Sequence, residues 1–181
     1  MAAVLVFLIG TAYFTWVSRR ALARPRSHGF YRFFAWECML ALVLVNFPRW
    51  SDNPYSPRQL VSWLLLAGSA VLAVHAVRLL KQRGAPGARG DAALLAFERT
   101  STLVTSGAYR YIRHPMYASL LFLAWGAFLK DVSPASVALV AGATLALLLT
   151  ALRDEAECRQ YFGAEYADYM KTSKRFVPFV F

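Results

Sequence analysis

The feature that most constrains this chain is a pair of long apolar stretches, residues 60–80 and 134–152. A bilayer core of about 30 Å requires roughly 20 apolar residues in a helix, and both stretches are near or above that length. Because lipid offers the backbone no hydrogen-bond partners, such a segment satisfies its own backbone as a helix. We therefore predict an all-α integral membrane protein.

Three shorter apolar runs, residues 2–17, 33–47 and 116–129, are candidates for further spans. At about 1.5 Å per residue, the last run reaches only about 21 Å, so a re-entrant segment is the alternative for it. The composition favours the membrane class, because 58% of the residues are hydrophobic and only 17% are charged. We predict five transmembrane helices.

The net charge of +10 results from basic residues that lie on one side of the predicted spans. With the N-terminus outside, the inner segments 18–32, 78–115 and 153–181 hold 5, 7 and 5 Lys and Arg residues, whereas the outer segments 48–59 and 130–133 hold 2 and 1. Such an excess is typical of cytoplasmic loops. The pattern predicts an N-out, C-in topology and explains the charge without a nucleic-acid partner.

The first apolar run is followed, not preceded, by basic residues, Arg19 and Arg20. This order differs from that of a cleaved signal peptide, so we expect a retained span. The membrane would be the plasma (inner) membrane in a bacterium or the endoplasmic reticulum in a eukaryote. Cys38 and Cys158 lack a paired ligand spacing, and we expect no metal site.

We predict one domain over residues 1–181, with a three-span bundle (1–80) and a helical hairpin with a cytoplasmic tail (101–181). The connection contains "GAPGARG", 84–90, which lacks the strand and helix of a dinucleotide motif and therefore predicts a loop. Aromatic residues of the tail recur at helical spacing among charges, which indicates an amphipathic helix with its aromatic face on the membrane or over the hairpin. They are Tyr161, Phe162, Tyr166 and Tyr169.

Polar residues crowd against the start of the fourth apolar run, in "SGAYRYIRHPMY", 106–117. Pro115 suits the first turn of a helix, which places His114 at or near the N-cap. The unpaired amides and the dipole of a helix start attract an anion, and Arg113 and His114 add donors there. We predict an anion site for a carboxylate or phosphate of a cofactor.

The fifth apolar run returns to the same membrane face and is followed by Asp154, Glu155 and Glu157. These acids suit the ammonium group or the ribose hydroxyls of a ligand whose carboxylate lies at the helix start. The alternative is that the acids only pair with Arg153 and Arg159 on their own helix. Arg110 and Arg113 would then only contribute to the positive-inside bias.

"TLVTSGAYRYIRHPMY", 102–117, resembles the cofactor-binding signature of isoprenylcysteine carboxyl methyltransferases and related membrane methyltransferases. "FGAEYADY", 162–169, followed by "FVP", is similar to the C-terminal pattern of that family. The resemblance covers about residues 101–181. It implies S-adenosylmethionine as the methyl donor and a small lipophilic or lipid-like acceptor, such as a prenylcysteine-type carboxylate, that enters from the bilayer.

By position, the resemblance also implies which residues bind the cofactor. They are Thr102, Leu103, Val104, Tyr109, His114, Pro115, Met116, Tyr117, Asp154 and Glu155. Arg113 and Glu155 would position the reactants. In-line methyl transfer depends on positioning and exclusion of water, so no enzyme nucleophile or base is assigned.

The chain departs from many relatives where they carry an arginine four residues before the first paired acid, a position linked to the acceptor's carboxylate. Thr150 stands there, the first acid is Asp154 rather than glutamate, and Arg153 lies nearby. Polar residues inside a span are functional candidates, which applies to Glu37 and His75. We expect Glu37 to lie at the acceptor site, together with Arg153 at the end of the fifth apolar run.

Two other classes of function stay open at this point. One is an NADPH-dependent membrane reductase of the steroid-reductase kind, whose C-terminal hairpin is broadly similar. The other is a non-enzymatic membrane protein, such as a small channel or an assembly factor. Such a reductase should have a longer bundle than five spans and extra basic residues for the 2′-phosphate of NADPH. A non-enzymatic protein has no need for two polar clusters that converge on one cavity.

Overall fold

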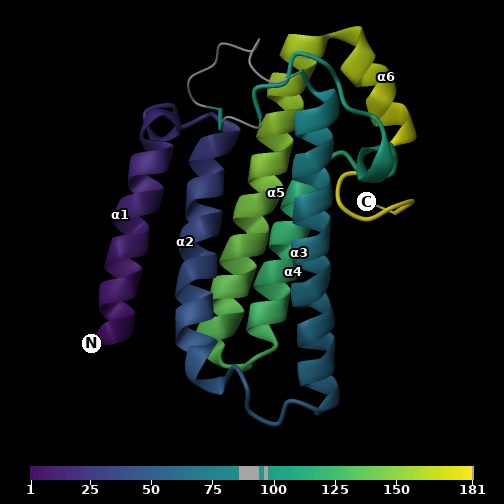
Figure 1. Cartoon of the computed structure of the whole chain (residues 1–181). Coiled ribbons are helices and arrows are strands. Elements are labelled where there is room, and N and C mark those ends of the chain that lie inside the picture. Colours follow the sequence, from purple (N-terminus) through teal and green to yellow (C-terminus); the bar gives the residue numbers. More distant parts are fainter. Residues whose placement is uncertain (86–93, 96–97, 181) are drawn as a thin grey trace.

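The computed structural model describes residues 1–85, 94–95 and 98–180 (Figure 1). Within these residues the regular structure is helical, with one isolated parallel bridge between Ile112 and Lys174. The helices are α1 (Ala2–Leu22), α2 (His28–Asn46), η1 (Phe47–Arg49), α3 (Pro57–Arg83), η2 (Gly107–Arg110), α4 (Pro115–Phe128), α5 (Pro134–Phe162) and α6 (Ala164–Thr172). The predicted all-α class is confirmed for the described residues.

Within the described residues, four helical segments are long and apolar enough to cross a membrane: α1, α2 together with η1, α3 and α5. α4 has only 14 residues and reaches about 21 Å. It packs against α3 and α5 inside the bundle (Figure 1). The length and composition of these helices are consistent with a multi-pass membrane protein, whereas the use of α4 as a fifth span and the N-out, C-in orientation stay predictions.

The helices α2, α3 and α5 begin at serine caps, and each includes residues outside its predicted apolar run. Ser27, Ser56 and Ser133 each accept a hydrogen bond from a first-turn amide of α2, α3 and α5, and proline occupies the first turn of α3 and α5. Such caps satisfy amides that have no partner within the helix. α2 therefore starts five residues before the predicted span 33–47, and its polar first turn includes His28 and Arg32.

The core of the bundle lies between α2, α4 and α5, where buried small and aliphatic side chains meet. Ala35 and Leu42 of α2, Ala124 of α4, and Ala143 and Leu147 of α5 are all fully buried. Small side chains let helix backbones approach closely, which suits packing inside a membrane. α1 lies at one edge of the bundle next to α2 (Figure 1). It exposes most of its apolar side chains.

Polar side chains join the helices at the end of the bundle where the N-terminus lies. Asn46 donates to the carbonyls of Ala127 (2.8 Å) and Asp131 (3.2 Å) and accepts from the Ser136 hydroxyl (2.8 Å). Lys130 is fully buried, donates to Gln59 (2.9 Å) and lies 3.2 Å from the centre of the Trp63 ring. These bonds fix the α4–α5 turn against α2 and α3.

The opposite end carries the tail. α5 continues without a break from its apolar part to Phe162, and Gly163, with φ +60° and ψ −130°, separates it from α6. Most L-residues avoid this backbone conformation, so glycine marks the bend. The tail is thus two helical segments rather than one. The predicted glycine-rich loop lies mostly outside the described residues, since only Gly84 and Ala85 of it are described.

The segment after α6 folds back onto the residues that precede α4. Arg113 and His114 donate their backbone N–H groups to the carbonyls of Lys174 (2.7 Å) and Arg175 (3.2 Å), and Lys174 donates to Tyr111 (3.0 Å). The Tyr169 hydroxyl donates to the Tyr109 carbonyl at 2.5 Å. The C-terminal part of the chain therefore holds the approach to α4 in place.

Candidate active site

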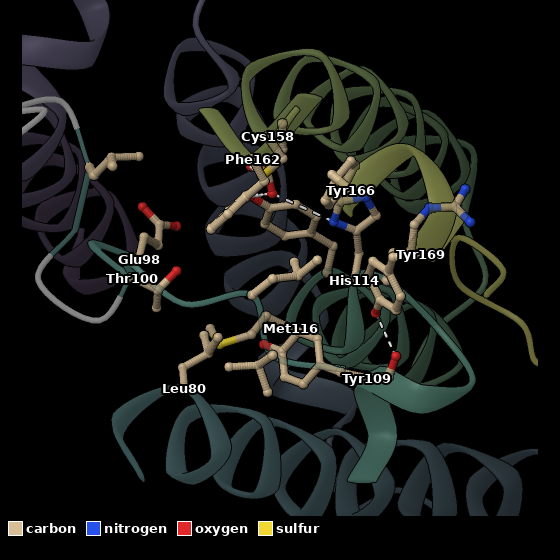
Figure 2. Close-up of a pocket in the computed structure, with 16 residues that line it drawn as sticks. Leu80, Glu98, Thr100, Tyr109, His114, Met116, Cys158, Phe162, Tyr166 and Tyr169 are labelled. Carbon is tan, nitrogen blue, oxygen red and sulfur yellow. Dashed lines mark hydrogen bonds and ion pairs between the residues drawn. The ribbon is translucent and has the colours of Figure 1, made fainter. Parts of the chain in front are cut away.

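A cavity lies between the ends of α3, α4 and α5 and the segment that precedes α4, and α6 covers it (Figure 2). The cavity has a volume of about 110 Å³ and is partly open to the surface. The lining residues are Leu80, Leu94, Glu98, Thr100, Leu103, Val104, Tyr109, Arg113, His114, Met116, Tyr117, Asp154, Cys158, Phe162, Tyr166 and Tyr169.

His114 forms the N-cap of α4 and Pro115 its first residue, which confirms the predicted helix start. The imidazole is 5% exposed and stacks on the Tyr117 ring at a centroid distance of 5.3 Å. Its Nδ1 lies 3.5 Å from the Asp154 carboxylate, and its Nε2 lies 3.4 Å from that of Glu155. Burial by itself would lower the pKa of His114, but the two carboxylates raise it above its ordinary value.

Glu155 joins the start of α4 to the C-terminal segment. Its carboxylate accepts from Arg113 Nε and Nη2 (3.0 and 2.9 Å) and from Arg175 Nε and Nη2 (3.0 Å each). Glu155 is 2% exposed and lies behind the cavity wall rather than in it. The basic and acidic clusters therefore contact each other through Glu155.

Asp154 lines the cavity, whereas Glu155, which was also expected to line it, does not. Its carboxylate accepts from the Tyr117 hydroxyl at 3.1 Å and from the Cys158 thiol at 3.5 Å. His114 Nδ1 and the Tyr117 hydroxyl both contact Asp154 Oδ2, so the carboxylate is held in one orientation. Asp154, His114 and Tyr117 thus share one corner of the cavity, as the sequence predicted.

The aromatic side chains of the tail close the cavity. Tyr166 and Tyr169 are buried and line it, together with Phe162 at the end of α5. Tyr166 stacks on Phe162 at a centroid distance of 6.5 Å. The aromatic face therefore lies over the hairpin, one of the two predicted orientations. Burial raises the pKa of Tyr109, Tyr166 and Tyr169, so these phenols stay neutral.

Other predicted residues do not line the cavity. Thr102 and Arg153 are exposed on the surface, and Pro115 is buried in the first turn of α4. Glu37 accepts a hydrogen bond from the Thr11 hydroxyl at 2.7 Å and therefore lies between α2 and α1. The sequence shows that Glu37 is in a span, but the rotation of α2 turns it away from the cavity.

His75 lies on the exposed side of α3 rather than in the cavity. It accepts a weak hydrogen bond from the Ala108 amide at 3.4 Å, which connects α3 to η2.

The sequence reasoning missed one charged wall of the cavity. Glu98 and Thr100 line the side opposite Tyr109 and Tyr169 (Figure 2). Glu98 pairs with Arg32, and burial alone would raise the pKa of its carboxyl, but Arg32 and His28 lower it to about 2. The only sequence signal was a single acid directly before the recognised motif, too little to assign it to a site.

Comparison with known proteins identifies the family of the chain. The family model described as phospholipid methyltransferase matches residues 57–165, more than half of the chain. The chain belongs to the phospholipid methyltransferase family. The matched region of this phospholipid methyltransferase family member runs from α3 to the start of α6 and contains most of the cavity wall.

Curated relatives carry more specific names. Protein-S-isoprenylcysteine O-methyltransferase A from Arabidopsis thaliana is 34% identical over 87 residues, which are 46% of this chain and 43% of the relative. A probable protein-S-isoprenylcysteine O-methyltransferase from Oryza sativa subsp. indica is 32% identical over 92 residues, 46% of this chain and 44% of the relative. The matches thus span less than half of these relatives. The resemblance to isoprenylcysteine carboxyl methyltransferases and related membrane methyltransferases is confirmed.

Proposed function

We propose that this protein is a membrane-embedded methyltransferase that uses S-adenosylmethionine and methylates a lipophilic or lipid-like acceptor. The observation that carries the proposal is the meeting of Arg113, His114 and Asp154 at one apolar and aromatic cavity. Membership of the phospholipid methyltransferase family and the names of the curated relatives support it. The same findings favour methyl transfer over the reductase and the non-enzymatic alternatives.

The chemistry of the cavity wall fits the proposed cofactor, which has an α-carboxylate, an α-ammonium group and an adenine ring. Arg113 and His114 are donors for the carboxylate, and the Asp154 carboxylate is an acceptor for the ammonium group. Leu103, Val104 and the aromatic side chains supply flat apolar walls for the ring. Thr102, Pro115 and Glu155 would act from behind or beside this wall, because they do not line it.

When bound, the cofactor supplies a methyl group on a positively charged sulfur, ready for in-line displacement. The protein then has to hold the reactants and exclude water. Tyr117 and Cys158 orient Asp154, Glu155 fixes Arg113, and Tyr166 covers the cavity from α6. None of these tasks requires a nucleophile on the enzyme.

We further propose that the chain is a single domain with five spans, an N-terminus outside and the cavity on the cytoplasmic side. α6 and the C-terminal segment lie at one end of the bundle (Figure 1), and the cavity lies at that end, because Tyr166 and Tyr169 of α6 line it. Seventeen of the twenty Lys and Arg residues lie in the segments assigned to that side. A lipophilic acceptor could reach this end from the bilayer.

Calorimetry in detergent tests the cofactor. We expect S-adenosylhomocysteine, the product form, to bind at submillimolar concentration and NADPH not to bind. Asp154→Asn should weaken this binding by at least about tenfold, because a hydrogen bond between charged groups is lost. Asp168→Asn on the exposed face of α6 removes the same charge and serves as the control. Binding of NADPH in place of S-adenosylhomocysteine would overturn the proposal.

The acceptor class is tested separately. A lipid extract is incubated with the protein and a methyl-labelled donor, and labelled species are identified by mass spectrometry. We expect label in a lipophilic species, and label only in water-soluble species contradicts the proposed acceptor class.

A further inference from the structure

A second group of charged side chains lies next to the cavity, and the proposed cofactor contacts do not use it. Arg32 Nη1 forms an ion pair with Glu98, and the Leu95 amide donates to the other Glu98 oxygen at 2.9 Å. His28 lies 3.6 Å from Glu98 and, on its other side, 2.7 Å from the Glu157 carboxylate. The group therefore connects α2, the segment before α4, and α5.

Two members of this group are deeply buried. Arg32 and His28 are each 2% exposed. Within the described part of the chain, Arg32 Nε and His28 Nε2 have no hydrogen-bond partner. Burying a charge removes it from water at a large cost in free energy, and apolar side chains of similar volume often stabilise a fold as well or better. Apolar contacts would attach the segment before α4 to α2 and α5 at a lower cost than these buried charges. We therefore expect the network to hold a charged group for binding a ligand.

That charge is the Glu98 carboxylate. Its side chain is 15% exposed and lines the cavity, on the side opposite Tyr109 and Tyr169 (Figure 2). A carboxylate can accept about four hydrogen bonds, so capacity remains beyond the Arg32 and Leu95 contacts. Apolar side chains of Leu80, Leu94 and Met116 line the same cavity.

We propose that Glu98, held by Arg32 and His28, is the group that binds the methyl acceptor, and that it selects a head group with N–H or O–H donors on an apolar body. This inference rests on the proposed function. Arg32, the cation beside Glu98, is already paired with it. A carboxylate acceptor would meet like charges at Glu98 and Asp154, whereas an amine or a hydroxyl would find acceptors.

The transfer step is balanced for such a head group. A bond forms between the acceptor nitrogen or oxygen and the methyl carbon, the bond from that carbon to sulfur breaks, and one proton leaves the acceptor. Because the pKa of Glu98 is lowered to about 2, this carboxylate holds the donor but does not retain the proton. The proton passes to water at the open mouth of the cavity, and Glu98 is a positioning residue.

The test compares three probes with the same chain length, dodecylamine, dodecanol and dodecanoic acid, below their micellar concentrations. Binding to the full chain in detergent is measured by calorimetry with and without S-adenosylhomocysteine. We expect the amine and the alcohol to bind at least about tenfold more tightly than the acid. Equal or tighter binding of the acid overturns the inference.

The variant Glu98→Gln keeps the shape of the side chain and removes its charge. We expect the affinity for the amine to fall about tenfold while the affinity for S-adenosylhomocysteine stays the same. Glu165→Gln, which removes an exposed acid of α6, is the matched control. If Glu98→Gln lowers the melting temperature but leaves the ratio of amine to acid affinity unchanged, the network is only structural and the inference is wrong.

Glu98→Gln leaves Arg32 buried without its partner, so the double variant Arg32→Met/Glu98→Gln is measured in parallel. The double variant should also lose the preference for the amine, and retention of that preference contradicts the role of Glu98. If the wild-type protein does not bind S-adenosylhomocysteine, the proposed function is wrong. The role of Glu98 is tested independently, because the three probes are also measured without S-adenosylhomocysteine.

Discussion

Glu155 shows how one buried side chain can support a site without entering it. Arg113, His114 and Arg175 surround its carboxylate, and these residues come from the start of α4 and from the C-terminal segment. Arg113 in turn lines the cavity, with a side chain that is 8% exposed. The orientation of Arg113 therefore depends on a residue of α5 that lies behind it.

The first prediction concerns this carboxylate. Glu155→Gln should lower the free energy of unfolding by about 3–5 kcal/mol, because it leaves the buried Arg113 without its counterion. S-adenosylhomocysteine binding should weaken as well, since Arg113 loses its fixed position. Thermal unfolding and calorimetry in detergent measure the two effects, with Glu165→Gln as the exposed control. Wild-type stability in the variant contradicts the ion-pair network.

The second prediction is a pH dependence at His114. The carboxylates of Asp154 and Glu155 raise its pKa in the folded state above the ordinary value of about 6.5. Its contribution to stability is therefore complete below about pH 6.5 and is lost as the pH rises through the raised pKa. The melting temperatures of wild type and His114→Gln should converge with increasing pH. If the difference between the two melting temperatures grows with pH, the pKa of His114 is not raised in the folded state and the prediction is wrong.

At the scale of the elements, the two ends of the bundle serve different purposes. The end near the N-terminus is joined by uncharged hydrogen bonds through Asn46 and by buried Lys130 on the Trp63 ring. The other end carries the cavity and is closed by α6 and the C-terminal segment. Stability and ligand binding should accordingly be separable by mutation.

The third prediction uses this separation. Asn46→Ala removes a buried amide that bonds to two carbonyls and to the Ser136 hydroxyl. The free energy of unfolding should fall by about 1–3 kcal/mol or more, because the buried partners of Asn46 lose their hydrogen bonds. The affinity for S-adenosylhomocysteine should not change at a temperature where the variant is folded. Ser51→Ala, at an exposed position of the same end, is the control.

The fourth prediction concerns the bend between α5 and α6. Gly163 has φ +60°, and no atom lies within 4 Å of a Cβ built there, so Gly163→Ala tests backbone conformation without a steric clash. The strain should displace α6 and with it Tyr166 and Tyr169, which weakens S-adenosylhomocysteine binding. Calorimetry measures the affinity for S-adenosylhomocysteine in this variant and in the control Ala164→Ser. Equal affinities would show that the bend does not position the cavity cover.

For the whole molecule, the arrangement of charge predicts how the protein sits in its membrane. The cavity, α6 and most Lys and Arg residues belong to the end assigned to the cytoplasm. The fifth prediction is that a reporter enzyme active only in the cytoplasm is active when fused to the C-terminus and inactive when fused to the N-terminus. The reverse pattern would refute the N-out, C-in orientation, and equal activity at both ends would refute an odd number of spans.

Much of this protein follows from local sequence patterns. Apolar runs such as 134–152 predict helices because the bilayer dictates their length, and the His–Pro pair at 114–115 predicts the start of α4 because proline suits the first helical turn. The family resemblance also depends on contiguous motifs. These properties are carried by neighbouring residues and need no knowledge of packing.

The tertiary structure alone decided which charges meet. Arg113 pairs with Glu155 across 42 positions, and Arg32 pairs with Glu98 across 66, so these partners depend on how α2, α5 and the segment before α4 pack together. The rotation of α2 likewise turns Arg32 toward Glu98 and Glu37 toward Thr11 of α1. A sequence pattern shows that a helix carries a charge, but the partner of that charge is set by the packing of segments far apart in the chain.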